Sequence, residues 1–285
     1  EIGKLGFNFA WILVPSVVSY ALDALGWRCT LGRHAKKIRF DRLFMTRMAG
    51  EAVNYTTPGL YLGGEPMKAY LLSRHQVPLV DGMASVVTAK TTMTFAEVTF
   101  IMIGIGLSTV LLVHSGDLLM PSLVGLGLLG FGAGLFVAVQ RFGLFISLLR
   151  VLERLGVKIA WLQAREHKLQ ALDDAIRDFY VRDRRGFLCS FLAFFAGWLV
   201  GAVEVYLILY FLGLPVDWPT AVALEALAVF AKGGTAFIPG SVGGQEAGTV
   251  LLFVAFGYTE AAGVTFAVVR RLREIVWIAF GLWAL

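Results

Sequence analysis

The chain has 285 residues, of which 58% are hydrophobic and only 16% are charged, and its mean hydropathy is +0.74. Soluble domains are about half apolar and about a quarter charged, so this composition excludes an ordinary soluble domain. The apolar residues stand in blocks of about 20, the length of helix that crosses a hydrocarbon core. The sequence therefore predicts an all-α, polytopic membrane protein.

The net charge is +5, and most basic residues are concentrated in two places. Of the 25 Lys and Arg, seven lie between residues 28 and 47 and ten between residues 141 and 185. Such clusters are typical of loops on the cytoplasmic side of a membrane, and this pattern argues against a nucleic-acid partner. We therefore expect both stretches to be cytoplasmic, with residues 141–186 forming amphipathic helices on that surface.

The chain contains only two cysteines, Cys29 and Cys189, and both lie near the basic stretches. Disulfides are rare in the cytoplasm, so we do not expect these two residues to be paired. The sequence contains no CxxC motif and no His–Cys cluster, so no metal site and no cofactor is expected.

Hydropathy indicates several membrane crossings. The expected apolar spans are residues 7–27, 94–113, 118–139 and 187–212, and a last helix follows Glu260. A span of this length crosses a core of ~30 Å at 1.5 Å per residue. The short links that contain Asp117 and Asp217 carry no Lys or Arg, so we expect them on the external side.

Two stretches interrupt the apolar sequence with proline and glycine. They read TPGLYLGGE, ending at Glu65, and FIPGSVGGQE, ending at Glu246. Proline removes a backbone donor and glycine is a weak helix former, so a continuous helix is disfavoured at both places. In hydrocarbon a broken helix survives only where protein or water shields its backbone. The alternative is that each stretch is a loop between two spans.

The two stretches match in register as well as in composition. Pro58, Gly59 and Glu65 recur 181 residues later as Pro239, Gly240 and Glu246, and each stretch has a further glycine, Gly64 or Gly244. The same offset relates Glu51 to Lys232 and Lys90 to Arg271. This pattern predicts an internal repeat. Its halves would be about 1–115 and 187–285 within a single transmembrane domain of residues 1–285.

The repeat is expected to be inverted. The first motif follows a basic cytoplasmic loop, the second follows an external loop without bases, and three predicted crossings separate them. Inverted repeats with broken or re-entrant helices meeting near mid-membrane are the architecture of many transporters.

The charged residues near the motifs suggest a binding site. Lys90, Lys232, Arg270 and Arg271 lie in or near apolar sequence, where an unpaired charge costs ~3 kcal/mol or more. The helices that restart near the motif glycines would offer free N–H groups to an anion. We therefore expect a translocation site for an anionic lipid headgroup. Its candidate residues are Glu51, Asn54, Pro58, Gly59, Gly64, Glu65, Lys90, Lys232, Pro239, Gly240, Gly244, Glu246, Arg270 and Arg271. Internal salt bridges that only hold the bundle together are the alternative.

The motif N-x-x-x-P-G…G-G-E-P-x-K, from Asn54 to Lys68, is followed by I-P-G-S-V-G-G-Q-E and a late Arg pair. Together they resemble the lysylphosphatidylglycerol synthase transmembrane-region family, also called flippase-like. The resemblance implies a bacterial or archaeal plasma membrane and the handling of phospholipid or polyprenyl-linked lipid. Lys90 departs from the family pattern, in which we would expect Arg, and an ammonium cannot bind phosphate in bidentate fashion.

The expected function is therefore that of a lipid flippase or transporter without covalent chemistry. The sequence holds no soluble aminoacyl-transferase domain, so we expect a stand-alone member, for which a hopanoid-associated branch is one candidate. Two alternatives stay open. One is a membrane enzyme or accessory subunit acting on a lipid-linked headgroup or sugar, although no nucleophile–base pair supports it. The other is an ion-coupled transporter of small solutes.

Overall fold

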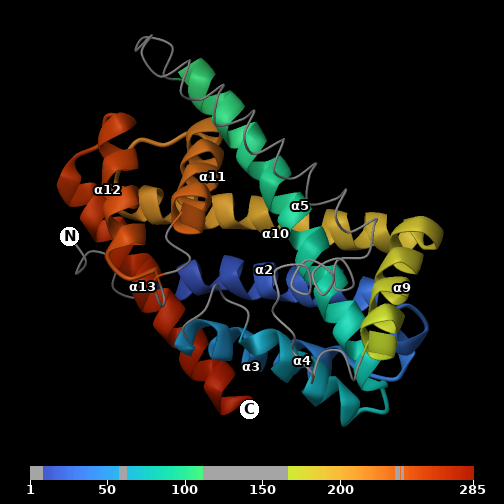
Figure 1. The fold of residues 1–285 in the computed structure, drawn as a ribbon. Helices are drawn as coiled ribbons and strands as arrows, with labels where there is room; N and C mark the ends of the chain where they lie inside the picture. Colours follow the sequence, from blue (N-terminus) through green and yellow to red (C-terminus); the bar gives the residue numbers. More distant parts are fainter. Residues whose placement is uncertain (1–8, 58–62, 112–165, 235–237, 239–240) are drawn as a thin grey trace, which may run out of the picture.

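The computed structural model describes residues 9–57, 63–111, 166–234, 238 and 241–285. Within these residues all regular structure is helical (Figure 1). The helices are α2 (Phe9–Thr30), η2 (Gly32–Lys36), α3 (Phe40–Thr56), α4 (Gly64–Ser73), α5 (Leu79–Leu111), α9 (Glu166–Arg182), α10 (Arg184–Phe211), α11 (Trp218–Gly234), α12 (Gly244–Ala255) and α13 (Glu260–Trp283). In this part of the chain, α2, α5 and α10 are long and apolar enough to cross a membrane.

These helices confirm the all-α, polytopic class that the hydropathy predicted. Three of the expected spans correspond to α2, α5 and α10. The predicted span at 118–139, the external link at Asp117 and the first part of the basic segment at 141–186 lie outside the described residues. The end of that segment forms α9, whose Leu172 and Ile176 pack against Ala84 of α5.

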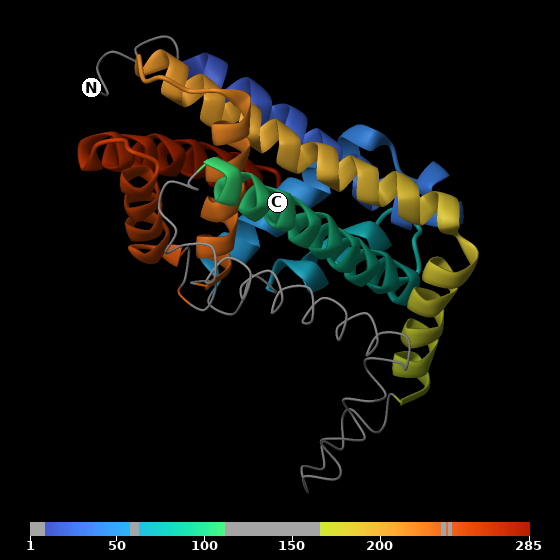
Figure 2. The same cartoon turned by 90° about the horizontal axis from the view of Figure 1, so that it is seen from above.

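Helices α2 and α10 lie side by side and antiparallel (Figures 1 and 2). Near one end, the Ser16 hydroxyl of α2 donates a hydrogen bond to Glu204 of α10 at 3.0 Å. Near the other end, Cys29 and Cys189 are joined by a disulfide. The expectation that these cysteines are unpaired was therefore wrong, because the antiparallel packing brings together two residues that are 160 positions apart.

The first motif separates two helices that turn back on each other. α3 ends at Thr56 and α4 begins at Gly64. The Asn54 side chain joins them, because it accepts a hydrogen bond from the Gly64 N–H at 2.6 Å and donates one to Glu65 at 3.1 Å. Gly64 also lies against Gly50, where an added Cβ would be 1.8 Å from the Gly50 carbonyl oxygen. Only glycine permits this approach of α4 to α3.

The second motif separates α11 from α12 in the same way. Asp217 caps α11 by accepting a hydrogen bond from the Thr220 N–H at 2.9 Å, and hydrogen bonds from Thr220 hold the pKa of the Asp217 carboxyl below its usual value. At the start of α12, Gly243 has a φ of +84° and its N–H donates to Glu246 at 2.8 Å. The predicted helix restarts near Gly64 and Gly244 are thus confirmed.

Each long helix that follows a broken pair packs against the other broken pair. Helix α5 packs against α11, where Gly104 faces Ala226 so closely that an added Cβ would clash. Helix α13 packs against α3, where Gly281 lies against the carbonyl oxygen of Met48. The two halves therefore share one order of elements and exchange their last helices. An inverted repeat would produce this arrangement, but the repeat itself stays a prediction.

Candidate functional site

A cavity of about 280 Å³ lies between the two halves of the chain. Six helices contribute to its wall: α2, α3, α5, α10, α11 and α13. The acidic and basic residues that line it are Asp23, Arg47, Glu51, Lys90, Glu97, Glu204, Glu225, Lys232, Arg270 and Arg273. Ionised side chains are costly against lipid tails, so their convergence on one internal space follows from the membrane setting.

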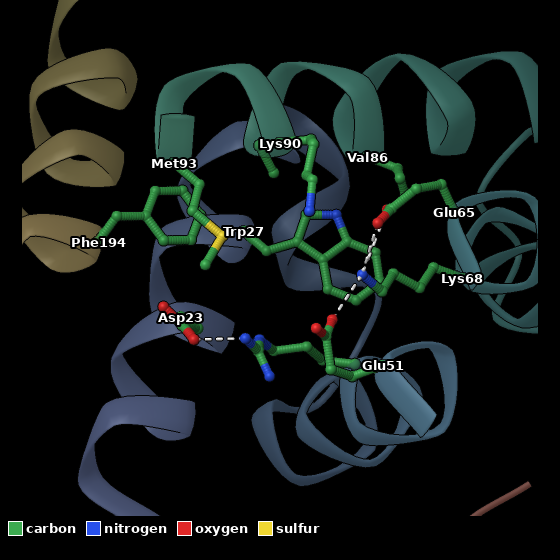
Figure 3. Close-up of a pocket in the computed structure, with 11 residues that line it drawn as sticks. Asp23, Trp27, Glu51, Glu65, Lys68, Val86, Lys90, Met93 and Phe194 are labelled. Carbon is green, nitrogen blue, oxygen red and sulfur yellow. Dashed lines mark hydrogen bonds and ion pairs between the residues drawn. The ribbon is translucent and has the colours of Figure 1, made fainter. Parts of the chain in front are cut away.

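A smaller pocket of about 40 Å³ adjoins this cavity (Figure 3). The two spaces share five lining residues, which are Asp23, Arg47, Glu51, Lys90 and Met93. The smaller pocket adds Glu65 and Lys68 from α4. Figure 3 shows Lys90 pointing from α5 into this pocket. Lys90 therefore stands where the two spaces meet.

In the first half, the charges form close pairs. Arg47 of α3 forms a salt bridge with Asp23 of α2, and both residues are buried. The Lys68 ammonium lies 3.1 Å from Glu65 and 3.5 Å from Glu51, as the dashed lines in Figure 3 indicate. These contacts connect α2, α3 and α4. Arg47 is the last base of the basic stretch 28–47, and its burial against Asp23 shows that α3 enters the bundle.

In the second half, two arginines of α13 pair with two deeply buried glutamates. Arg270 binds Glu225 through two hydrogen bonds of 2.6 and 3.0 Å. Arg273 donates to Glu204 at 2.5 Å. Both glutamates are only 2% exposed. A buried carboxylate requires such a partner, so these pairs hold α13 against α10 and α11.

A second group of charges lies beside the cavity. Glu274 accepts hydrogen bonds from Lys232 at 3.0 Å and from Arg271 at 2.9 Å. Arg271 also forms a salt bridge with Glu246, at the start of α12. Lys232 lines the large cavity, whereas Arg271 and Glu246 line neither of the two spaces described above.

Two charged residues of α5 lack the salt bridges that the other charged residues of the cavity form in the described part of the chain. Lys90 and Glu97 both line the large cavity and are partly buried. Their side chains have no hydrogen bond or ion pair with any residue that the structure describes. They are seven residues apart, close to two turns, so they lie on the same side of the helix.

The candidate residues thus divide into groups. Glu51, Lys90, Lys232 and Arg270 line the large cavity, and Glu65 lines the smaller pocket. Asn54 and Gly64 join α3 to α4, Gly244 begins α12, and Glu246 and Arg271 pair with each other. Pro58, Gly59, Pro239 and Gly240 lie outside the described residues.

Several residues of the site were not among those candidates. They are Asp23, Arg47, Lys68, Glu97, Glu204, Glu225 and Arg273. Helical periodicity could have identified Arg273, because positions 270 and 273 share a face and position 271 does not. Glu97 and Glu204 could have been found as carboxylates inside predicted spans. Among the residues with described positions, no group of three or more His, Cys, Asp or Glu could hold a metal ion.

Apolar helices around a charged internal cavity define an all-α, polytopic membrane protein. The chain matches the family described as "Lysylphosphatidylglycerol synthase TM region" over residues 5–281, and it therefore belongs to that family. The family is a membrane domain associated with lipid handling. Comparisons with curated proteins and with solved structures gave no match.

Proposed function

We propose that this protein moves a lipid with an anionic headgroup across the plasma membrane of a prokaryote. The observation that carries the proposal is the position of Lys90. Its side chain lies where the two internal spaces meet, and no carboxylate among the described residues pairs with it. A cation in such a setting needs water or an anionic ligand. A lipid phosphate is the anion that a membrane supplies.

The paired charges favour Lys90 over the other bases as the headgroup contact. Arg47, Arg270 and Arg273 each have a carboxylate partner in the bundle. Binding a phosphate at one of these arginines would compete with that carboxylate and would leave it buried without a partner. Lys90 can bind a phosphate without breaking a pair.

The broken helices support movement of the bound lipid. α3 with α4 and α11 with α12 form two short helical pairs, of which α3 and α11 line the cavity, and we propose that each pair re-enters the membrane from one side. Transporters built from such pairs alternate the exposure of a central site by moving one half against the other. In the same way the headgroup would pass through the cavity while the acyl chains stay in the lipid.

Internal salt bridges that only stabilise the bundle remain the competing explanation. They account for the Arg270–Glu225 and Arg273–Glu204 pairs, which need no ligand. They do not account for Lys90, since that residue contributes to no such pair in the described part of the chain. The decisive variant is therefore at position 90.

The experiment is transbilayer movement of fluorescent phosphatidylglycerol in liposomes that contain the purified full chain, with phosphatidylcholine as the zwitterionic comparison. We expect Lys90→Gln to slow the movement of phosphatidylglycerol about tenfold, because a hydrogen bond to a charged group contributes about 1.5 kcal/mol or more. Its melting temperature should stay close to that of the wild type. Arg177→Gln, which removes an exposed positive charge from α9, is the matched control and should leave transport unchanged.

Two results would contradict the proposal. One is a wild-type protein that moves no lipid in these liposomes. The other is a Lys90→Gln protein that moves phosphatidylglycerol as fast as the wild type does.

A further inference from the structure

We propose that Glu97 takes up a proton when an anion binds at Lys90, so that the cavity is a proton-linked anion site. This inference rests on the proposed function in one respect, which is that the anion is taken to be a lipid headgroup phosphate. Its structural basis is separate and lies in the pairing of the carboxylates that line the cavity.

Glu97 differs from the other four carboxylates of the cavity wall. Each of those four has a basic partner, in the pairs Asp23–Arg47, Glu51–Lys68, Glu204–Arg273 and Glu225–Arg270. The Glu97 side chain has no partner among the residues whose positions are described. A carboxylate that lacks a basic partner in a low-dielectric setting takes up a proton more readily than a paired one. Glu97 is therefore the carboxylate of the cavity best suited to change its charge.

The positions of Glu97 and Lys90 on α5 explain how the two sites would be linked. Seven residues of helix separate their Cα atoms by roughly 10 Å. An anion held by Lys90 would be repelled by an ionised Glu97 over about this distance, which weakens its binding about tenfold at the effective dielectric constant of a protein. Protonation of Glu97 removes this repulsion. By linkage, binding of the anion must favour protonation to the same extent.

The other titratable groups of the cavity do not provide the same link. They come from every helix packed around Glu97, and they are Tyr20 and Asp23 of α2, Arg47, Glu51 and Tyr55 of α3, Lys90 of α5, Glu204 of α10, Glu225 and Lys232 of α11, and Arg270 and Arg273 of α13. Apart from Lys90 and the two tyrosines, each of them forms a salt bridge with a residue of opposite charge. Tyr20 lies against Arg47 and Tyr55 lies against Lys232.

A proton carried on Glu97 would balance the charge of one phosphate. The cavity with both ligands bound would carry the same net charge as the empty cavity. A lipid anion and a proton would then cross together, so a pH gradient could drive the lipid in one direction.

The test measures proton uptake directly. A short-chain phosphatidylglycerol is titrated into the detergent-solubilised full chain by calorimetry, in buffers of different ionisation enthalpy at one pH. The dependence of the measured heat on the buffer gives the number of protons taken up for each anion bound. We expect the wild type to take up at most about half a proton for each anion bound, and its affinity to fall about tenfold as the pH rises through the titration of Glu97.

The variants identify the proton-binding group. Glu97→Gln should take up no proton and should bind the anion about tenfold more tightly at a pH above the titration of Glu97, whereas Lys90→Gln should bind it about tenfold more weakly. Asp174→Asn, which removes an exposed carboxylate from α9, should behave as the wild type does. If Glu97→Gln does not fold, the buffer and pH dependence of the wild type still decides whether binding is proton-linked.

Failure of this inference can be told apart from failure of the proposed function. If the wild type binds the anion without proton uptake, or if Glu97→Gln takes up as many protons as the wild type, the inference is wrong and lipid movement in liposomes can still stand. If the short-chain lipid does not bind but liposomes show lipid movement, the inference is again wrong. If neither binding of the short-chain lipid nor lipid movement in liposomes is found, both proposals are wrong.

Discussion

The Lys232 ammonium of α11 donates a hydrogen bond to the Tyr55 hydroxyl of α3 at 2.9 Å, and it lies 5.0 Å from the centre of the Tyr55 ring. Tyr55 precedes Pro58 by three residues, and Lys232 precedes Pro239 by seven. The helices that lead into the two motifs are therefore in contact. That the motifs themselves lie close together inside the membrane stays a prediction, and the following predictions test the surrounding structure.

The contact between Gly64 and Gly50 should be sensitive to a single methyl group. Gly64→Ala places a Cβ against the Gly50 carbonyl oxygen, so α4 must move away from α3. We expect a loss of about 1–3 kcal/mol of stability, measured as a lower melting temperature in detergent. Gly106→Ala is the control, because a Cβ there meets no atom within 4 Å and alanine favours the helix. A Gly64→Ala protein with the same melting temperature as the Gly106→Ala control would contradict this contact.

The losses of stability caused by substituting Arg270 and Glu225 should not be additive, because the two side chains form a buried pair. Arg270→Met leaves a carboxylate that is 2% exposed without its main partner, which costs about 3–5 kcal/mol. The double variant Arg270→Met, Glu225→Gln should regain much of this loss, because the uncompensated charge is gone. Thermal melting of the two single variants and the double variant measures the coupling energy. Strictly additive losses would show that the two side chains do not form the pair.

Substitution of Lys90 and substitution of Arg271 should have different effects on stability, although the offset of the predicted repeat relates the two positions. Arg271→Ala removes hydrogen bonds to Glu246 and Glu274, so we expect an earlier thermal transition. Lys90→Ala breaks no pair in the described part of the chain and should change stability by less than about 0.5 kcal/mol. Measuring melting and lipid movement on the same preparations separates a structural base from a ligand-binding one. Equal destabilisation by both changes would count against the assignment of Lys90.

The antiparallel packing of α2 and α10 predicts the sidedness of their ends. Cysteines introduced at Arg33 and at Arg182, in a background with Ser at positions 29 and 189, should react with a membrane-impermeant thiol reagent from one side. A cysteine at Asp217 should react only from the other side, because it follows the opposite end of α10. The accessibility of each cysteine is measured in intact and in permeabilised cells. Labelling of positions 33 and 217 from the same side would rule out this topology.

The helices and their breaks could be predicted from the sequence because they depend on local signals. Apolar blocks of about 20 residues gave the long helices, and the proline–glycine stretches marked the two breaks. The helix that follows each break starts at a glycine, Gly64 or Gly244, as expected.

The partners of the charged residues could not be predicted in the same way. Asp23 and Arg47 are 24 positions apart, and Glu204 and Arg273 are 69 apart. Nothing in the local sequence states which carboxylate meets which guanidinium, because that depends on how whole helices pack. The same reason explains why the Cys29–Cys189 pairing was missed.

The exchange of last helices between the two halves has a consequence for folding and assembly. Helix α5 packs against α11, and α13 packs against α3, so each interrupted helix is covered in part by the opposite half of the chain. A fragment that ends after α5 would expose the flank of α3 to lipid, and a fragment that begins at α10 would do the same to α11. The halves should consequently be insoluble or rapidly degraded when produced singly, and should recover a native bundle when produced together. Neither half can then complete its helix packing before the other half has been inserted into the membrane.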